Sequence, residues 1–330
     1  LDTAIAVGSD FQITINETIY NFGSTENQIF TGQVTDFSNL FYKKTNFNAD
    51  ISYWNTSKAT TMRSMFQGAR RFDQNISNWD VSNVTNMRSM FQGAKDFNQN
   101  MSNWDVSSVT NMRSMFQGAN NFNGSINNWG SKTKNVKNMR GMFAGAISFN
   151  QHIQSWDVSK VTDMRSMFYR AKSFNKKLNR WNREDSGDES NTANVINMQK
   201  MFFEATSFNN GESTKLNFNV TKVLHFKEMF KGASAFNKDI SEWTLRSDKN
   251  NFPKMDKFLE NANSFNQDLS SWNVEKITAE PAKFATTTQS NFKEPCWGNN
   301  GCTSEELIPK LINFSPEGMQ NVTPDDPLNL

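Results

Sequence analysis

Residues 84–94 read Val84-Thr85-Asn86-Met87-Arg88-Ser89-Met90-Phe91-Gln92-Gly93-Ala94. Further copies of this block, aligned on Met87, recur at intervals of 25 to 34 residues. The aligned positions are Phe37, Met62, Met112, Met139, Met164, Met198, Phe226 and Met255. A period in this range is typical of a repeat array, in which each unit buries its apolar face against its neighbours. The sequence therefore predicts one elongated array of nine turns, and not two globular domains.

A second motif lies between these blocks. It consists of a Phe, an aliphatic residue four positions later and a Trp seven positions later. Its copies are Phe47-Ile51-Trp54, Phe72-Ile76-Trp79, Phe97-Met101-Trp104, Phe122-Ile126-Trp129, Phe149-Ile153-Trp156, Phe174-Leu178-Trp181, Phe236-Ile240-Trp243 and Phe265-Leu269-Trp272, with a degenerate copy at Phe208. We expect these Phe, Trp and Met residues to form the core, because few other apolar side chains are available.

The apolar residues of the first block follow one another at steps of three, three, one and three, which is the stripe of a short helix. Thr85 is a plausible N-cap, and Gly93 lies where a left-handed residue often ends a helix. The Asn-rich segment that follows predicts a short strand and a turn. The expected fold is an α/β repeat solenoid of the leucine-rich-repeat type, in which each turn contributes a short helix and a short parallel strand, capped at both ends.

Three regions follow from this organisation. Residues 1–33 are expected to form an N-terminal cap with a strand near residues 11–15, because an end turn otherwise exposes its core and a sheet edge. Residues 34–275 hold the repeats. Residues 276–330 are expected to form a C-terminal cap and tail, with a short helix from Ser304.

Two recurring polar positions have structural interpretations. Asn follows the repeat Phe in every copy except one, where the residue is Asp73. We expect an inward ladder of these side chains that satisfies backbone groups from one turn to the next, with a ligand-binding array as the alternative. Asp80, Asp105 and Asp157 follow a Trp and are expected to form turns rather than to act as catalytic acids.

The composition excludes some partners. The chain has 35 basic and 33 acidic residues and a net charge of +2, so nothing in the overall charge favours nucleic acid or an anionic membrane. No apolar run is long enough to cross a bilayer, and no signal-peptide pattern opens the chain. Because residue 1 is Leu, we expect a mature or trimmed chain whose leader was removed.

Two local features outside the repeat invite a chemical reading. Cys296 and Cys302 are the only cysteines and lie close enough for a small-loop disulfide, with free thiols as the alternative. Too few ligands accompany them for zinc. The acidic stretch 182–194 is expected to be a solvated loop, because its spacing does not match a calcium loop.

One column of basic residues is the candidate binding site. Arg63, Arg88, Arg113, Arg140 and Arg165 occupy the same position in five successive repeats. Stacking would align them into a basic stripe able to bind carboxylates, sulfates or phosphates. The alternative is that each Arg pairs with a nearby Asp or covers apolar surface with its stem.

Catalysis is not indicated. His152 and His225 occupy non-equivalent positions, and no nucleophile motif or phosphate-binding Gly loop is present. We therefore predict no catalytic residues, no metal and no cofactor. Several Asn-x-Ser/Thr sequons occur, whose use would depend on the host.

The joined repeat, as it stands at residues 72–91, closely resembles that of a mycoplasma surface-lipoprotein repeat family of unknown function, related to BspA-type leucine-rich-repeat surface proteins. The resemblance covers about residues 34–275. It implies a protein displayed outside the cell and attached to host or neighbouring cells, with no catalytic residues to carry over. Long insertions after Trp181 and around residues 208–223 depart from the regular pattern.

The function predicted from these observations is non-enzymatic recognition or adhesion, extracellular or at the cell surface. The expected partner is a surface protein or glycan of a host or neighbouring cell, bound on an extended face; the oligomeric state stays open. The alternative is an architectural spacer or surface-layer component without a ligand. A weaker third possibility is a glycan-active enzyme whose chemistry lies in the non-repeat ends.

Overall fold

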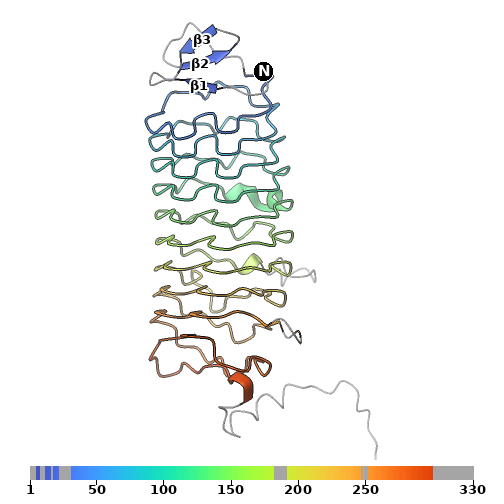
Figure 1. Cartoon of the computed structure of the whole chain (residues 1–330), viewed down its shortest axis with the longest axis vertical. Coiled ribbons are helices and arrows are strands. Elements are labelled where there is room, and N and C mark those ends of the chain that lie inside the picture. Colours follow the sequence, from blue (N-terminus) through green and yellow to red (C-terminus); the bar gives the residue numbers. More distant parts are fainter. Residues whose placement is uncertain are drawn as a thin grey trace, which may run out of the picture.

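The computed structural model describes residues 5–7, 12–15, 18–21, 31–181, 192–246, 248 and 252–299. The repeats form irregular coils stacked one on the next into a long column, as Figure 1 shows. A three-stranded antiparallel sheet at the N-terminal end contains β1 (Ile5–Val7), β2 (Gln12–Ile15) and β3 (Thr18–Asn21), in the order β1-β2-β3. The strand expected near residues 11–15 is thus confirmed as β2.

Successive coils are held in register by single parallel bridges. Within each coil the bridging residue directly precedes the position equivalent to Met87. The bridges form one column: Asp36, Thr61, Asn86, Asn111, Asn138, Asp163, Asn197, His225 and Lys254. Equivalent positions of neighbouring repeats therefore lie beside one another, about 4.8 Å apart as in a parallel pair.

The predicted α/β solenoid of the leucine-rich-repeat type is wrong. Within the described ranges the only helices are short 3₁₀ segments, η1 (Asn127–Thr133), η2 (Asn179–Trp181) and η3 (Trp297–Asn299). The repeats form turns where helices were expected, and the described Asn-rich segments such as 97–104 form no strand; the main column of isolated bridges lies at the start of the Met block. Each coil is therefore built from consecutive turns rather than from a helix and a strand.

The backbone of the Met block explains why no helix forms. Ser89 and Gly93 have φ of 56° and 72°, in the left-handed region that a right-handed helix excludes. The N–H groups of Met90, Gln92 and Ala94 donate to the carbonyl three residues earlier, as in successive β-turns. These turns, each closed by a bond to the carbonyl three residues earlier, bring the same apolar side chains inward as a helix would. The left-handed conformation expected at Gly93 is confirmed.

The peptide groups between positions 86 and 93 that join the coils all point the same way. The N–H groups at positions 87, 89, 91 and 93 donate to carbonyls of the following coil at 2.7 to 3.0 Å. The carbonyls at positions 86, 88, 90 and 92 accept from the preceding coil. A parallel β-strand instead directs both kinds of group to each side. The coil-to-coil peptide dipoles of this block are consequently aligned along the column, as they are along a helix.

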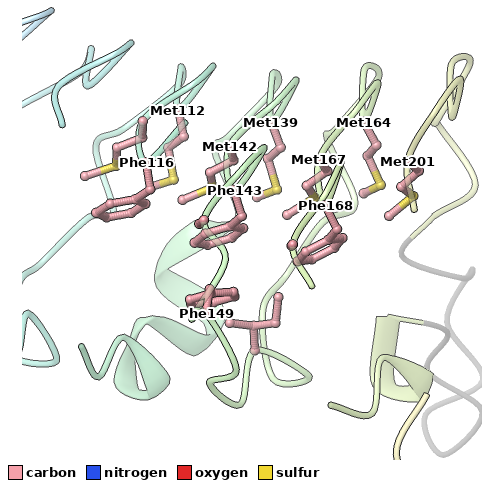
Figure 2. Packing of buried hydrophobic residues seen from close by; sticks show 14 of the residues in the cluster. Met112, Phe116, Met139, Met142, Phe143, Phe149, Met164, Met167, Phe168 and Met201 are labelled. Carbon is pink, nitrogen blue, oxygen red and sulfur yellow. The ribbon is translucent and has the colours of Figure 1, made fainter. Parts of the chain in front are cut away.

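The core consists of aromatic and Met columns that run the length of the stack. Two Phe of each coil lie face to face with centroids 3.7 to 4.1 Å apart, as in Phe116 and Phe122. Each also stacks on its equivalent in the next coil, Phe116 on Phe143 at 5.6 Å. Figure 2 shows the rings of Phe116, Phe143 and Phe168 beside the rows of Met139, Met142 and their equivalents. The core expected from the sequence is confirmed, because these side chains are completely buried.

The Trp column links coils through hydrogen bonds as well as contact. The indole N–H of Trp104 donates to the carbonyl of Ile76, and that of Trp129 to the carbonyl of Met101, at 3.1 and 2.9 Å. A buried indole is stable when its N–H has an acceptor. In these coils the aliphatic residue of the second motif thus contributes both an apolar side chain and, for the Trp of the following coil, a backbone acceptor; the indole N–H of Trp156 has no such partner among the described residues.

The predicted Asn ladder is present, although its side chains are not inward. The side-chain oxygen of Asn98 accepts from the backbone N–H of Asn123, and Asp73 does the same for Asn98, both at 2.8 Å. Equivalent bonds run from Asn48 to the N–H of Asn291. Asn98 and Asn123 are exposed, so the ladder lies on the surface and satisfies backbone donors there.

We expect Asn98→Ala to lower the free energy of unfolding by about 1 kcal/mol, because the N–H of Asn123 loses its protein acceptor. The midpoint of urea unfolding, followed by Trp fluorescence, measures the change. Asn98→Asp is the matched control and should be close to wild type, since Asp73 already performs this role. Equal destabilisation by both substitutions would show that the hydrogen bond is not what matters.

Parallel pairing continues past the expected boundary at residue 275. Bridges join Leu259 to Ala285 and Asp268 to Lys293, and Phe284 is completely buried in the core. The segment 281–293 thus covers the last regular coil. The predicted domain boundaries themselves stay predictions, and the helix expected from Ser304 lies outside the described residues.

Candidate functional site

The five arginines of the candidate stripe are brought together as predicted. Each lies two residues after the bridging residue of its coil, so the bridge column fixes their register. The backbone carbonyls of the last four, Arg88, Arg113, Arg140 and Arg165, accept from the N–H groups of Ser64, Ser89, Ser114 and Gly141 of the preceding coil, respectively. We call Arg63, Arg88, Arg113, Arg140 and Arg165 the arginine stripe. Arg63 is exposed and the other four are half-buried.

The stripe is only partly neutralised. Asp163 binds Arg165 through an ion pair with 2.8 Å between nitrogen and oxygen, and this hydrogen bond raises the pKa of Arg165. In the part of the chain that the structure describes, no ion pair to a carboxylate is formed by Arg63, Arg88, Arg113 or Arg140. The alternative in which each arginine pairs with a nearby Asp therefore holds for Arg165 alone.

Neighbouring arginines affect one another electrostatically. The pKa of Arg140 is lowered, first by partial burial and then by the charges of Arg165 and Arg113. Like charges at the spacing of one coil repel, so the stripe gains when a bound anion reduces that repulsion. This mutual effect is consistent with an aligned column of guanidinium groups.

The charge of the column changes along the stack. The bridging position, two residues before the Arg position, carries Asp at both ends of the stripe: Asp36 in the coil before Arg63, and Asp163 in the coil of Arg165. In the later coils the Arg position is occupied by Gln199, Lys227 and Asp256. Four consecutive coils thus carry an unneutralised arginine, which is the largest uniform charge on this column.

The C-terminal coils carry a second charged array that the sequence reading missed. Ion pairs join Arg170 to Glu204, Lys200 to Glu228 and Lys231 to Glu260 across neighbouring coils. The pKa of Glu260 is lowered by its hydrogen bond to Lys231. The sequence signal was the appearance of Lys, Arg and Glu at three positions that hold Ser89, Gln92 and Gly93 in the regular block. Because the signs alternate, this array offers no net charge to an anion.

The Asp residues after Trp form turns, as predicted. The carboxylates of Asp80, Asp105 and Asp157 each accept from the backbone N–H two residues later, at 2.9 to 3.1 Å. The pKa of Asp105 is lowered by its hydrogen bond to Ser107. The Asn residues of several sequons do the same, as Asn100 does for the N–H of Ser102. Their spacing is thus explained by turn geometry.

The histidines do not form a site. His225 is one of the bridging residues, and its pKa is lowered by partial burial and by the charge of Lys254. His152 is exposed on another coil. The described residues contain no group of three or more His, Cys, Asp or Glu placed to hold a metal ion. They likewise contain no helix long and apolar enough to cross a membrane.

Two sequence predictions fall largely outside the described residues. Cys302 lies outside the described residues, so its predicted disulfide with Cys296 stays a prediction. Cys296 itself is buried. The acidic loop predicted at 182–194 lies outside them up to residue 191.

Comparison with known proteins identifies the family but not an activity. No curated protein matches the chain. A solved structure described as "Crystal structure of TLR13-ssRNA13 complex" is 8% identical over 65% of this chain, with a TM-score of 0.12. The match spans 46% of the length of that chain, and a likeness this weak bears on neither fold nor function.

A family model described as "Mycoplasma protein of unknown function, DUF285" matches residues 14–129, 99–190 and 184–297. These matches extend beyond the repeats recognised in the sequence at both ends. The relation to BspA-type proteins stays a prediction. The chain belongs to the DUF285 family of Mycoplasma proteins of unknown function.

Proposed function

We propose that this chain is a non-enzymatic recognition protein of the cell surface or extracellular space, which binds a surface protein or glycan of another cell along the face that carries the arginine stripe. The observation that carries the proposal is the row of four unneutralised arginines, Arg63, Arg88, Arg113 and Arg140. Guanidinium groups form strong charge-assisted hydrogen bonds with carboxylates, sulfates and phosphates.

The shape of the molecule supports a macromolecular partner. A column of stacked coils extends along one long axis (Figure 1). Extended repeat surfaces suit partners that make many shallow contacts. Among the residues that the structure describes, the same regularity separates the titratable side chains by coil. The alternative, an architectural spacer, needs no charged face and makes no use of the stripe.

We expect joint substitution of Arg88, Arg113 and Arg140 by Ala to abolish salt-sensitive binding of the chain to cultured host cells, measured by flow cytometry with labelled protein. The fold should survive, because the coil-to-coil bonds at these positions use the backbone. Binding of the wild-type chain should fall as salt rises from about 0.05 to 0.3 M, since screening shortens the range of surface charges.

The matched control replaces Arg70, Arg71 and Lys95 by Ala, which removes the same charge from exposed positions of neighbouring coils outside the stripe. This variant should bind as the wild type does. Equal loss in both variants would make the effect one of net charge. Absence of binding by the folded wild-type chain would favour the architectural alternative.

A further inference from the structure

The columns beside the arginine stripe are polar and ordered. On one side, three residues before Arg63, Arg88 and Arg113, lie the exposed Thr60, Thr85 and Thr110, whose hydroxyls donate to carbonyls of the preceding coil at 3.2 Å. Before Arg140 this position holds Lys137. These bonds use the hydroxyl proton and leave oxygen lone pairs as acceptors. On the other side, Gln92 donates to Gln117 along its column. The stripe is thus flanked by fixed groups suited to hydroxyl-bearing ligands.

Within the four coils that carry unneutralised arginines, the same columns lack the aromatic residues of other polyanion sites; the Gln column holds Tyr42 in the coil before them and Tyr169 in the coil after them. In the four coils with unneutralised arginines, the position four residues after Arg holds Gln67, Gln92, Gln117 and Ala144. No aromatic ring is present there on which bases could stack, as single-stranded nucleic acid binding requires. Nor is there an aromatic anchor of the kind that dominates protein interfaces.

The spacing of the stripe selects between the remaining polymers. Coils repeat about every 4.8 Å, whereas same-side residues of an extended peptide recur about every 6.6 Å. An acidic peptide therefore loses register with the arginines within two coils. A pyranose ring in an extended polysaccharide advances its chain by about the same distance as one coil. Anionic sugars at each ring or at alternate rings stay in register.

We propose that Arg63, Arg88, Arg113 and Arg140 bind a linear acidic polysaccharide, carrying sulfate or uronic carboxylate groups, which lies extended along the long axis of the stack. This assignment rests on the proposed function and names its ligand class. The arginines bind the anionic groups, while the Thr and Gln columns on either side hydrogen-bond the sugar hydroxyls. Arg165 marks the end of the site, because Asp163 already occupies it.

The test measures binding of the whole chain to purified polymers at about 0.05, 0.15 and 0.3 M salt, conditions over which charge-driven affinity changes strongly. The probes are heparin, polygalacturonate, neutral dextran, poly-L-glutamate and oligo-dT. Heparin or polygalacturonate should bind with a Kd at least about tenfold below those of poly-L-glutamate and oligo-dT, and dextran should not bind.

The arginine variants decide whether the stripe is responsible. Substituting Arg88, Arg113 and Arg140 by Ala should raise the polysaccharide Kd at least about tenfold and reduce the slope of log K against log salt by about three. The control at Arg70, Arg71 and Lys95 should change neither quantity. Tighter or equal binding of poly-L-glutamate or oligo-dT, or an unchanged Kd in the stripe variant, would overturn the assignment.

Cells treated with polysaccharide lyases separate this inference from the proposed function. Loss of wild-type binding after treatment supports both. Binding that survives treatment but still requires the arginines leaves the recognition function standing and refutes the polysaccharide as ligand. If untreated cells are not bound at all, the recognition function fails, and the purified polymers alone decide whether the stripe binds acidic polysaccharide.

Discussion

Phe116→Ala is expected to lower the free energy of unfolding by about 3–5 kcal/mol, the range for removing a large buried aromatic side chain. Phe116 is completely buried in the middle of the stack. Its ring lies 4.0 Å from that of Phe122 in the same coil and 5.6 Å from those of Phe91 and Phe143 in the adjacent coils. The cavity would thus weaken contacts in three coils at once, and neighbouring rings held by their own stacks cannot collapse into it.

The measurement is urea unfolding monitored by Trp fluorescence and by circular dichroism. Gln117→Ala, at the adjacent half-buried position, is the matched control and should cost less than about 1 kcal/mol, because only the contact from Gln92 is lost. In a repeat array a weakened centre can also uncouple the two halves, which would appear as a broadened or two-step transition. A loss below about 1 kcal/mol for Phe116→Ala would contradict a stack held together by its aromatic columns.

Gly124→Ala is expected to lower the free energy of unfolding by about 3 kcal/mol, at the upper end of overpacking effects. A Cβ added at Gly124 would lie 1.9 Å from the carbonyl oxygen of Gln99 and 2.7 Å from its carbonyl carbon, so the backbone of one coil must move. The other coils all carry a residue larger than Gly at this position, for example Gln74 and Gln151. Here the chain approaches the preceding coil more closely, and the carbonyl of Ser125 accepts from the N–H of Met101 at 2.9 Å.

Gly93→Ala separates this clash from the general effect of adding a methyl group. Its φ of 72° costs a side chain about 1–2 kcal/mol, but an added Cβ meets only ordinary contacts at 3.7 Å or more. Comparing the unfolding midpoints of the two variants gives the cost of the close approach. If Gly124→Ala is no more destabilising than Gly93→Ala, the two coils separate at Gly124 without a cost in free energy.

Much of the candidate site could be predicted from the sequence because it depends only on the repeat period. Equal spacing places Arg88, Arg113 and Arg140 in one column whatever the coil looks like, provided that the coils stack in register. Which arginines are neutralised could not be predicted. It depends on the side chain at the bridging position, Asp163 beside Arg165 but Asn138 beside Arg140, and on the turn that brings the two together.

The helix was predicted wrongly because its pattern is ambiguous. Apolar residues at steps of three, three, one and three fit one face of a helix. They also fit consecutive turns in which each N–H bonds to the carbonyl three residues earlier. The Ser at position 89 gives no clear sign that its φ is positive, since Ser commonly avoids the left-handed region. The preference of the isolated segment was overridden by bonds that only a neighbouring coil supplies.

The sequence by itself determined the period, the residues of the core, the Asn ladder and the alignment of the arginines, because each follows from repetition and from which side chains leave water. Only the tertiary structure decided the conformation of the coil. In the Met block, alternate N–H groups donate to carbonyls of the following coil, and alternate carbonyls accept from N–H groups of the preceding coil. Their partners, such as Asn111 for Met87, lie in the neighbouring coil, so the free energy that selects this backbone over a helix arises only once the coils are stacked.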